Sequence, residues 1–230
     1  MKTGKALFLL ILAAQLAGCS AHVAQQHSAL PYLSHPVNYY AGSIPPAPQP
    51  GSDADKADFA ALRDWQAKRT SQQCAQAKAQ AEATYDEFFG DISPFPSPLP
   101  DAVKEFVKTI YVEDDAIIGP IKSMYKRPRP FRRDAALDPC LGRIDGLAYP
   151  SGHSTQAHMV ALILSDLVPQ RRDEFMARAD AAALNRVIGG VHHPSDIAAG
   201  AKLAKFMYDE MKTRPEFIAK MNMLRAYLKH

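Results

Sequence analysis

The sequence predicts an all-α fold, and three observations support that prediction. Apolar residues recur at helical spacing in the first half of the chain, at Phe59, Leu62 and Trp65, at Tyr85, Phe88 and Phe89, and at Val103, Phe106, Val107 and Ile110. Alternating runs of β-branched residues, the pattern of strands, are nearly absent. The second half continues the helical spacing, and helices are expected at about 154–167, 170–187 and 194–211.

Glycine and proline set the boundaries of these segments. Gly189 and Gly190 suit the end of one helix, because glycine readily adopts the left-handed conformation that closes helices. Pro194 suits the first turn of the next helix, where the backbone N–H has no helical partner. The Pro-rich stretch 44–51 can be neither helix nor central strand, so residues 19–52 are expected to form a tether and lead-in.

Length and charge restrict the class of protein. Of the 230 residues, 47% are hydrophobic and 22% are charged, which is typical of one globular domain, expected here at 53–230. Lys and Arg number 27 against 24 Asp and Glu, a balance too even to indicate a nucleic acid as a specific ligand. The sequence is compatible with a homo-oligomer but does not define the oligomeric state.

The N-terminal residues predict export. Two lysines precede an apolar run at 6–14 that is too short to span a bilayer, so residues 1–18 are expected to be a signal peptide. The Leu-Ala-Gly-Cys run at 16–19 resembles the lipobox of bacterial lipoproteins. That resemblance implies acylation of Cys19, a membrane anchor, and a location on the periplasmic side of the cell envelope, at the outer membrane. The alternative is an ordinary secretory signal cut near Ala21.

Two further cysteines, Cys74 and Cys140, would lie in an oxidising compartment, which favours a disulfide between them. In the loop-entropy model such a crosslink stabilises the fold by about 4 kcal/mol. Two unpaired thiols are the alternative. The chain has no Cys or His spacing typical of a zinc site, and no metal is expected.

Three clusters in the second half combine cations, histidines and an acid: Lys122 with Arg129, the Pro-Ser-Gly-His run at 150–153, and Arg186 with His192 and Asp196. Together they resemble the signature of the type 2 phosphatidic acid phosphatase superfamily, Lys-x6-Arg-Pro, Pro-Ser-Gly-His and Ser-Arg-x5-His-x3-Asp. One position departs from it, because Asn185 stands where the family has serine. Within the superfamily the chain most resembles the bacterial class A nonspecific acid phosphatases.

The resemblance implies a helical bundle that hydrolyses phosphate monoesters through a covalent phosphoenzyme. It also implies a broad range of small phosphorylated substrates, a phosphotransferase side activity, and catalysis with neither metal nor bound cofactor. The departure at Asn185 bears on the breadth of that range, because an amide there can replace the hydroxyl as a donor or narrow the choice of substrate.

The residue types fit phosphoryl transfer, in which negative charge spreads over three oxygens and requires fixed donors around them. Lys122, Arg129 and Arg186 are expected to form a cationic cradle, and the arginine fork binds two oxygens at once. Ser151 and the Gly152 N–H can add donors, and glycine allows the backbone to approach the phosphate closely.

The histidines are expected to carry the covalent chemistry. His192, in neutral form, is the expected nucleophile, and Asp196 is expected to accept the N–H of its other ring nitrogen and fix the tautomer. His153 is expected to protonate the leaving oxygen and then to activate water as a base. This division predicts a bell-shaped pH profile with an optimum on the acid side.

Neighbouring residues are expected to have lesser roles. His193 is interpreted as a helix-entry residue without a catalytic role, and His158 as structural. The carboxylates at 113–115 lie in a helical pattern without a ligand loop, which argues against a metal site. Four more cations near Arg129 are expected to be solvated, to steer anionic substrates or to bind acidic headgroups: Lys126, Arg127, Arg132 and Arg133.

Three other functions remain open. Vanadium haloperoxidases share the signature but tend to be much longer. Lipid phosphate or diphosphate phosphatases also share it, although no segment after residue 18 is apolar over a membrane-spanning length. A lipid-tethered phosphate-binding domain would explain the cations but not the register of His153, His192 and Asp196.

Overall fold

A computed structural model of the chain describes residues 30–229. Within that range the regular structure is helical and includes no strand, so the predicted all-α class is confirmed. The predicted signal peptide and Cys19 lie outside the described residues.

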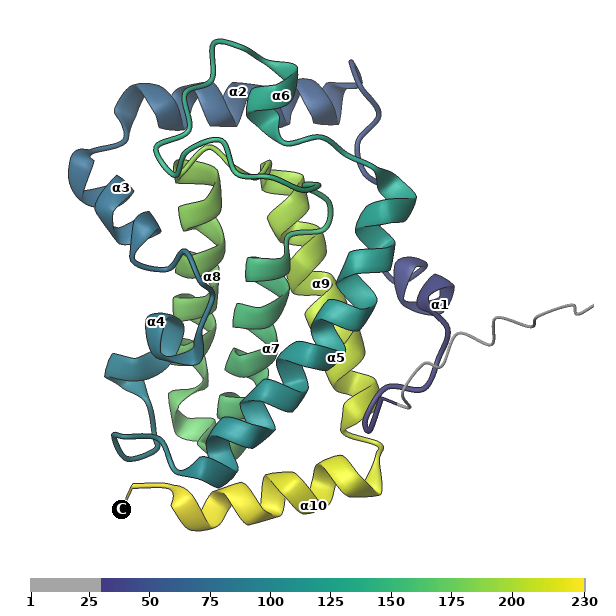
Figure 1. The fold of residues 1–230 in the computed structure, drawn as a ribbon, viewed down its shortest axis with the longest axis vertical. Coiled ribbons are helices and arrows are strands. Elements are labelled where there is room, and N and C mark those ends of the chain that lie inside the picture. The colour runs from purple at the N-terminus through teal and green to yellow at the C-terminus, as the bar shows by residue number, and fades with distance from the viewer. Residues whose placement is uncertain (1–29, 230) are drawn as a thin grey trace, which may run out of the picture.

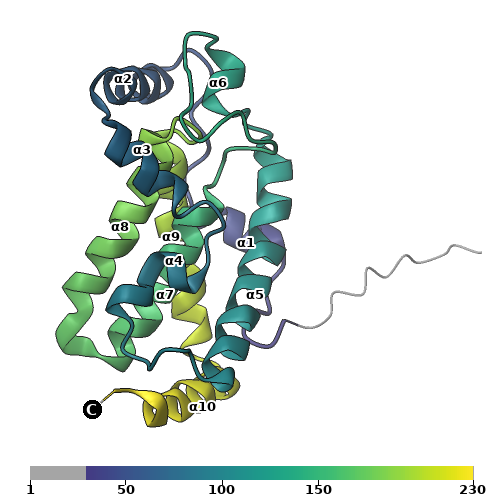
Figure 2. The ribbon, with the colours of Figure 1, turned by 60° about the vertical axis from the view of Figure 1, so that its left-hand side comes forward.

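The centre of the fold is α7 (Gly152–Leu167), which packs against α8 (Arg172–Ile188) and α9 (Pro194–Met211) (Figure 1). Most residues of α7 are buried, because α5 (Asp101–Tyr125) covers another of its sides (Figure 2). The short connections make α8 antiparallel to both α7 and α9. The starts of α7 and α9 and the end of α8 therefore lie at one end of the bundle.

Shorter helices surround this core. Near the end that holds the starts of α7 and α9 lie α2 (Asp53–Lys68) and α6 (Pro130–Arg133) (Figure 1). Along α8 lie α3 (Ser71–Lys78) and α4 (Tyr85–Phe89). The opposite end is closed by α10 (Pro215–Leu224), and α1 (Val37–Ala41) contacts α5 and α9. Short 3-10 turns occupy Gly90–Ile92, Pro169–Arg171 and Arg225–Tyr227.

Part of the segment interpreted as tether and lead-in packs onto this bundle. Tyr32, Leu33, Tyr40 and Ile44 are buried in the main hydrophobic cluster. The Tyr32 backbone N–H donates to Glu113 Oε1 at 2.9 Å, so this segment is fixed to the middle of α5. No described helix combines the length and the apolar composition that crossing a bilayer requires.

Cys74 and Cys140 form a disulfide, the pairing that the sequence left open. The bond joins α3 to the loop between α6 and α7 across a separation of 66 residues. The residue after Cys140 reaches the end of α8, where Leu141 N donates to the Gly189 carbonyl at 3.4 Å.

Removing this disulfide is expected to lower the stability of the fold. By loop entropy, a crosslink of this separation is worth about 4 kcal/mol, or roughly 10 °C in melting temperature for a chain of this size. The double variant Cys74→Ser/Cys140→Ser, compared with the oxidised wild type by thermal circular dichroism, measures the effect. Equal melting temperatures would show that the crosslink adds nothing to stability.

Candidate active site

The three motifs meet at one end of the bundle because of where their helices begin and end. Lys122 and Arg186 lie in the last turns of α5 and α8. Ser151 caps the N-terminus of α7, accepting from Ser154 N at 3.3 Å, and Asp196 lies in the first turn of α9. Two helix N-termini, which favour anions, thus lie beside two cations.

A close approach of α7 and α9 holds the second and third motifs together. Ser151 N donates to the Asp196 carbonyl at 3.0 Å, and Ser154 Oγ donates to the Ile197 carbonyl at 2.7 Å. A Cβ at Gly200 would lie 2.6 Å from the Ser151 carbonyl oxygen, so only glycine fits at this contact. Gly200 is thus what lets the Ser-Gly-His turn lie directly on the start of α9.

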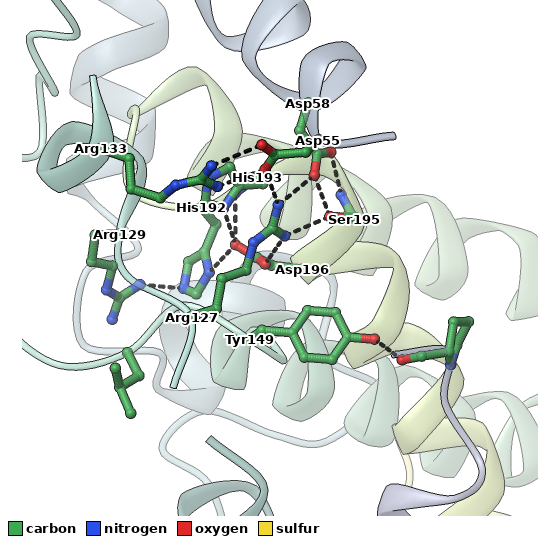
Figure 3. Close-up of polar contacts among 12 residues, drawn as sticks. Asp55, Asp58, Arg127, Arg129, Arg133, Tyr149, His192, His193, Ser195 and Asp196 are labelled. Atoms are coloured by element: carbon green, nitrogen blue, oxygen red, sulfur yellow. Dashed lines mark hydrogen bonds and ion pairs between the residues drawn. The ribbon is translucent and has the colours of Figure 1, made fainter. Parts of the chain in front are cut away.

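His192 lies between a cation and an acid (Figure 3). Its Nε2 is 2.6 Å from Arg129 Nη1, and its Nδ1 is 3.4 Å from Asp196 Oδ2, slightly beyond an ordinary hydrogen bond. A guanidinium can only donate, so Nε2 presents its lone pair and the proton is on Nδ1, facing the carboxylate. Burial lowers the pKa of His192 well below its usual value, so the ring is neutral.

Asp196 is fixed by several donors at once. Oδ2 accepts from His193 N and lies 2.8 Å from His193 Nδ1, while Oδ1 accepts from Arg127 Nη1 at 2.6 Å. Burial alone would raise the pKa of Asp196, but its contacts with His192 and His193 hold that pKa well below its usual value. His193 precedes α9 directly, as expected for a helix-entry residue, and it also helps to orient this carboxylate.

Arg129 and Arg186 are buried and Lys122 is half-buried, and none of the three has a carboxylate within ion-pair distance among residues 30–229. Arg186 is 3% exposed, and its Nε and Nη1 have no partner in this range. Lys122 Nζ donates to the Leu147 carbonyl at 2.8 Å. Burial and the charge of Arg129 lower the pKa of Lys122 to about 7 and that of Arg186 to about 10. A site of this kind attracts an anion.

His153 lies in the first turn of α7. Its Nε2 is 2.9 Å from the Ala81 carbonyl oxygen. Burial, together with the charges of Arg186 and Arg129, lowers the pKa of His153 to about 3. The charge of Arg129 thus lowers the pKa of both His192, the expected nucleophile, and His153, the expected acid.

Arg127 differs from its expected role. It is only 4% exposed, so it is neither solvated nor free to steer substrates. It donates to Asp196 Oδ1, to Ser195 Oγ at 2.6 Å and to Asp58 Oδ2 at 2.7 Å (Figure 3). It therefore ties the carboxylate beside His192 to α2.

Asp55 and Asp58 on α2 are the functional candidates that the motifs did not indicate. Asp55 accepts two hydrogen bonds from Arg133, at 2.6 and 2.8 Å, and Asp58 accepts from Arg127. Their spacing of three places both acids on one helix face, near the apolar Phe59 and Leu62. Acids on the apolar face of a helix are the signal that could have revealed a buried ionic network.

Comparisons with known sequences match the part of the chain that holds these motifs. The profile of the PAP2 superfamily matches residues 108–208, a range that includes Lys122, Arg129, His153, Arg186 and His192. An acid phosphatase from Zymomonas mobilis is 32% identical over 143 residues, 60% of this chain. A non-specific acid phosphatase from Providencia stuartii is 28% identical over 184 residues, 76% of this chain. The matches span 52% of the Zymomonas protein and 74% of the Providencia protein.

A solved structure has a similar fold. The transmembrane PAP2 type phosphatidylglycerolphosphate phosphatase from Bacillus subtilis superimposes with a TM-score of 0.51 at 18% identity, over 79% of this chain and 93% of that one. That likeness concerns the arrangement of helices. Residues 108–208 thus match the PAP2 superfamily, and the chain is similar to curated proteins named acid phosphatases.

Proposed function

We propose that the chain is an acid phosphatase that hydrolyses phosphate monoesters through a phosphohistidine on His192. The observation that carries this proposal is the combination of cations that lack a carboxylate partner among residues 30–229 with a neutral histidine whose Nε2 lone pair faces one of them. A phosphoryl group between Arg129, Arg186 and Lys122 would supply the missing negative charge.

In the first step, His192 Nε2 forms a bond to phosphorus as the bond from phosphorus to the leaving oxygen breaks. His153 gives a proton to that oxygen, and an alcohol departs. Asp196 stabilises the positive charge that develops on the His192 ring, because its Oδ2 lies 3.4 Å from Nδ1. The three cations stabilise the charge on the oxygens that do not leave.

In the second step, His153 takes a proton from water, and the water oxygen forms a bond to phosphorus as the phosphorus–nitrogen bond breaks. Inorganic phosphate leaves, and His192 is again neutral. An alcohol in place of water would give phosphotransfer by the same route. Gly152 precedes His153, and a Cβ added there would come no nearer than 4.0 Å to Ile118, so protein packing does not explain the glycine. A glycine at this position instead lets its backbone N–H approach a bound phosphate closely.

The pKa of His153 explains how substrate binding prepares it. With a pKa of about 3, the ring is neutral even in mild acid, because burial and the charges of Arg186 and Arg129 oppose a further positive charge. A bound phosphate dianion neutralises those arginines, so it raises the pKa of His153 and supplies the protonated form that the first step needs.

The rate of hydrolysis is therefore expected to be bell-shaped in pH. At high pH, kcat for an alkyl phosphate, whose leaving oxygen needs a proton, falls as His153 loses its proton in the complex. At low pH it falls only when His192 or Asp196 protonates, and the pKa of each is held well below its usual value. The optimum therefore lies in acid. His153→Asn is expected to remove the high-pH fall, and a wild-type rate that still rises above about pH 9 would contradict the assignment.

Assaying halide oxidation with vanadate and peroxide beside phosphate release separates this function from that of a haloperoxidase. Phosphate release without halide oxidation is expected. The proposed activity also includes a broad substrate range, which is measured as phosphate release from a panel of monoesters. It includes phosphotransfer as well, which is measured by adding alcohols to the same assay.

We also propose that the protein works on the periplasmic side of the envelope, held by an acylated Cys19. The disulfide between Cys74 and Cys140 supports an oxidising compartment. Mass spectrometry of the mature N-terminus tests the anchor, because a peptide beginning near residue 22 without lipid would mean ordinary secretion.

A further inference from the structure

The proposed acid, His153, is held by a segment that none of the three motifs includes. Residues 79–84 connect α3 to α4, and the Ala81 carbonyl oxygen lies 2.9 Å from His153 Nε2. A carbonyl oxygen only accepts hydrogen bonds, so Nε2 carries the proton. Nδ1 is therefore the ring nitrogen left to exchange a proton with substrate.

Asn185 fixes this segment through the side chain of Gln80. Both residues are buried, at 6% and 8% exposure. Asn185 Nδ2 donates to Gln80 Oε1 at 2.8 Å, and Gln80 Nε2 donates to the Glu87 carbonyl at 3.4 Å. A buried amide must keep its partners, and Gln80 immediately precedes Ala81. The amide pair therefore determines where the Ala81 carbonyl lies.

We infer that Asn185 and Gln80 are positioning residues for His153, acting through the Ala81 carbonyl to leave Nδ1 as the proton donor. This inference rests on the proposed function. In the protonated ring, Nε2–H donates to Ala81, and the Nδ1 proton goes to the leaving oxygen as its bond to phosphorus breaks. The ring returns to the neutral form that carries its proton on Nε2.

The two histidines are thus oriented by different partners. A carboxylate faces His192, which must tolerate a positive charge, whereas an uncharged carbonyl faces His153, which must release its proton readily. Asn185 occupies the position where the family signature has serine, and a serine side chain is too short to replace the amide contact with Gln80. Asn185→Ser restores the residue of the family signature and therefore tests whether the asparagine helps to position His153.

The expected signature is a dependence on the leaving group. For Asn185→Leu and Asn185→Ser, kcat/KM is expected to fall about tenfold with an alkyl phosphate, whose leaving oxygen needs a proton, and less than about twofold with p-nitrophenyl phosphate. Gln80→Leu should give the same pattern. The double variant Asn185→Leu/Gln80→Leu should lose no more kcat/KM with the alkyl phosphate than either single variant, because the pair acts as one unit.

Gln66→Leu is the matched control. Gln66 Nε2 on α2 donates to the Ala136 carbonyl at 3.0 Å, a side-chain amide contact between distant segments that does not reach His153, so both substrates should respond equally. All rates are compared below the melting temperature of each variant. An equal loss with both substrates in the Asn185 variants would overturn the inference.

His153→Asn separates this inference from the proposed function. A selective loss with the alkyl phosphate in His153→Asn, without one in Asn185→Leu, refutes only the positioning pair. An equal loss with both substrates in His153→Asn refutes the acid role of His153 itself, and the positioning inference with it.

Discussion

Replacing His192 by alanine is expected to lower kcat/KM for p-nitrophenyl phosphate by about 10⁴-fold or more. The nitrogen that forms the bond to phosphorus is lost, and water cannot take its place between Arg129 and Asp196. Inorganic phosphate should still bind with nearly wild-type affinity, because Lys122, Arg129 and Arg186 remain. Steady-state kinetics and calorimetric titration with phosphate measure the two quantities.

His35→Ala provides the control for the loss of an imidazole. His35 is exposed and its ring lies against Tyr39, so hydrolysis should be unchanged. A His192→Ala protein that turns over at the wild-type rate would exclude the phosphohistidine mechanism. Loss of phosphate affinity together with turnover would show instead that His192 is needed to form the cationic site.

Replacing Arg127 is expected to give the second large effect, on stability and on rate. Arg127→Leu leaves Asp58 and Asp196 buried without their shared partner, a change that typically costs about 3–5 kcal/mol. Arg127→Lys keeps the charge, but an ammonium cannot bridge the same acceptors as the planar fork. Misplacement of Asp196 then lowers kcat/KM by about 100-fold. Urea denaturation and kinetics on folded protein measure the two effects.

Arg133→Lys is the matched control for Arg127→Lys. Arg133 is an arginine of the same network, but its partner is Asp55 and it does not contact Asp196. The Arg133→Lys variant should therefore be less stable to urea but keep a kcat/KM near that of the wild type. If Arg127→Lys, fully folded, hydrolyses substrate at the wild-type rate, then Arg127 has a structural role alone.

The sequence predicted the central helices well, because their limits depend on local signals. The predicted helix at 194–211 has the bounds of α9, which begins at Pro194. α7 begins at Gly152 rather than Ser154, because Ser151 is its N-cap and so places Gly152 and His153 inside the first turn. α8 begins at Arg172 rather than Gln170, because Pro169 starts a 3-10 turn.

Contacts between distant segments could not be predicted in this way. Nothing local distinguishes Arg127, which is buried against α2, from Arg132, which is half exposed and pairs with Asp145. The hydrogen bond from Tyr32 to Glu113 and the chain of contacts from Asn185 to His153 also join residues far apart in sequence. The motifs indicated the chemistry, but only the fold identifies the residues that hold those motifs in place.

Trapping the covalent intermediate tests the central claim most directly, namely that a cationic site presents a phosphoryl group to His192 Nε2. The wild-type protein is mixed with a radiolabelled phosphate monoester, quenched within milliseconds in alkaline denaturant, and digested. The label should be stable in alkali, labile in acid, confined to the peptide that contains His192, and absent from His192→Ala. A label on any other residue would contradict the account.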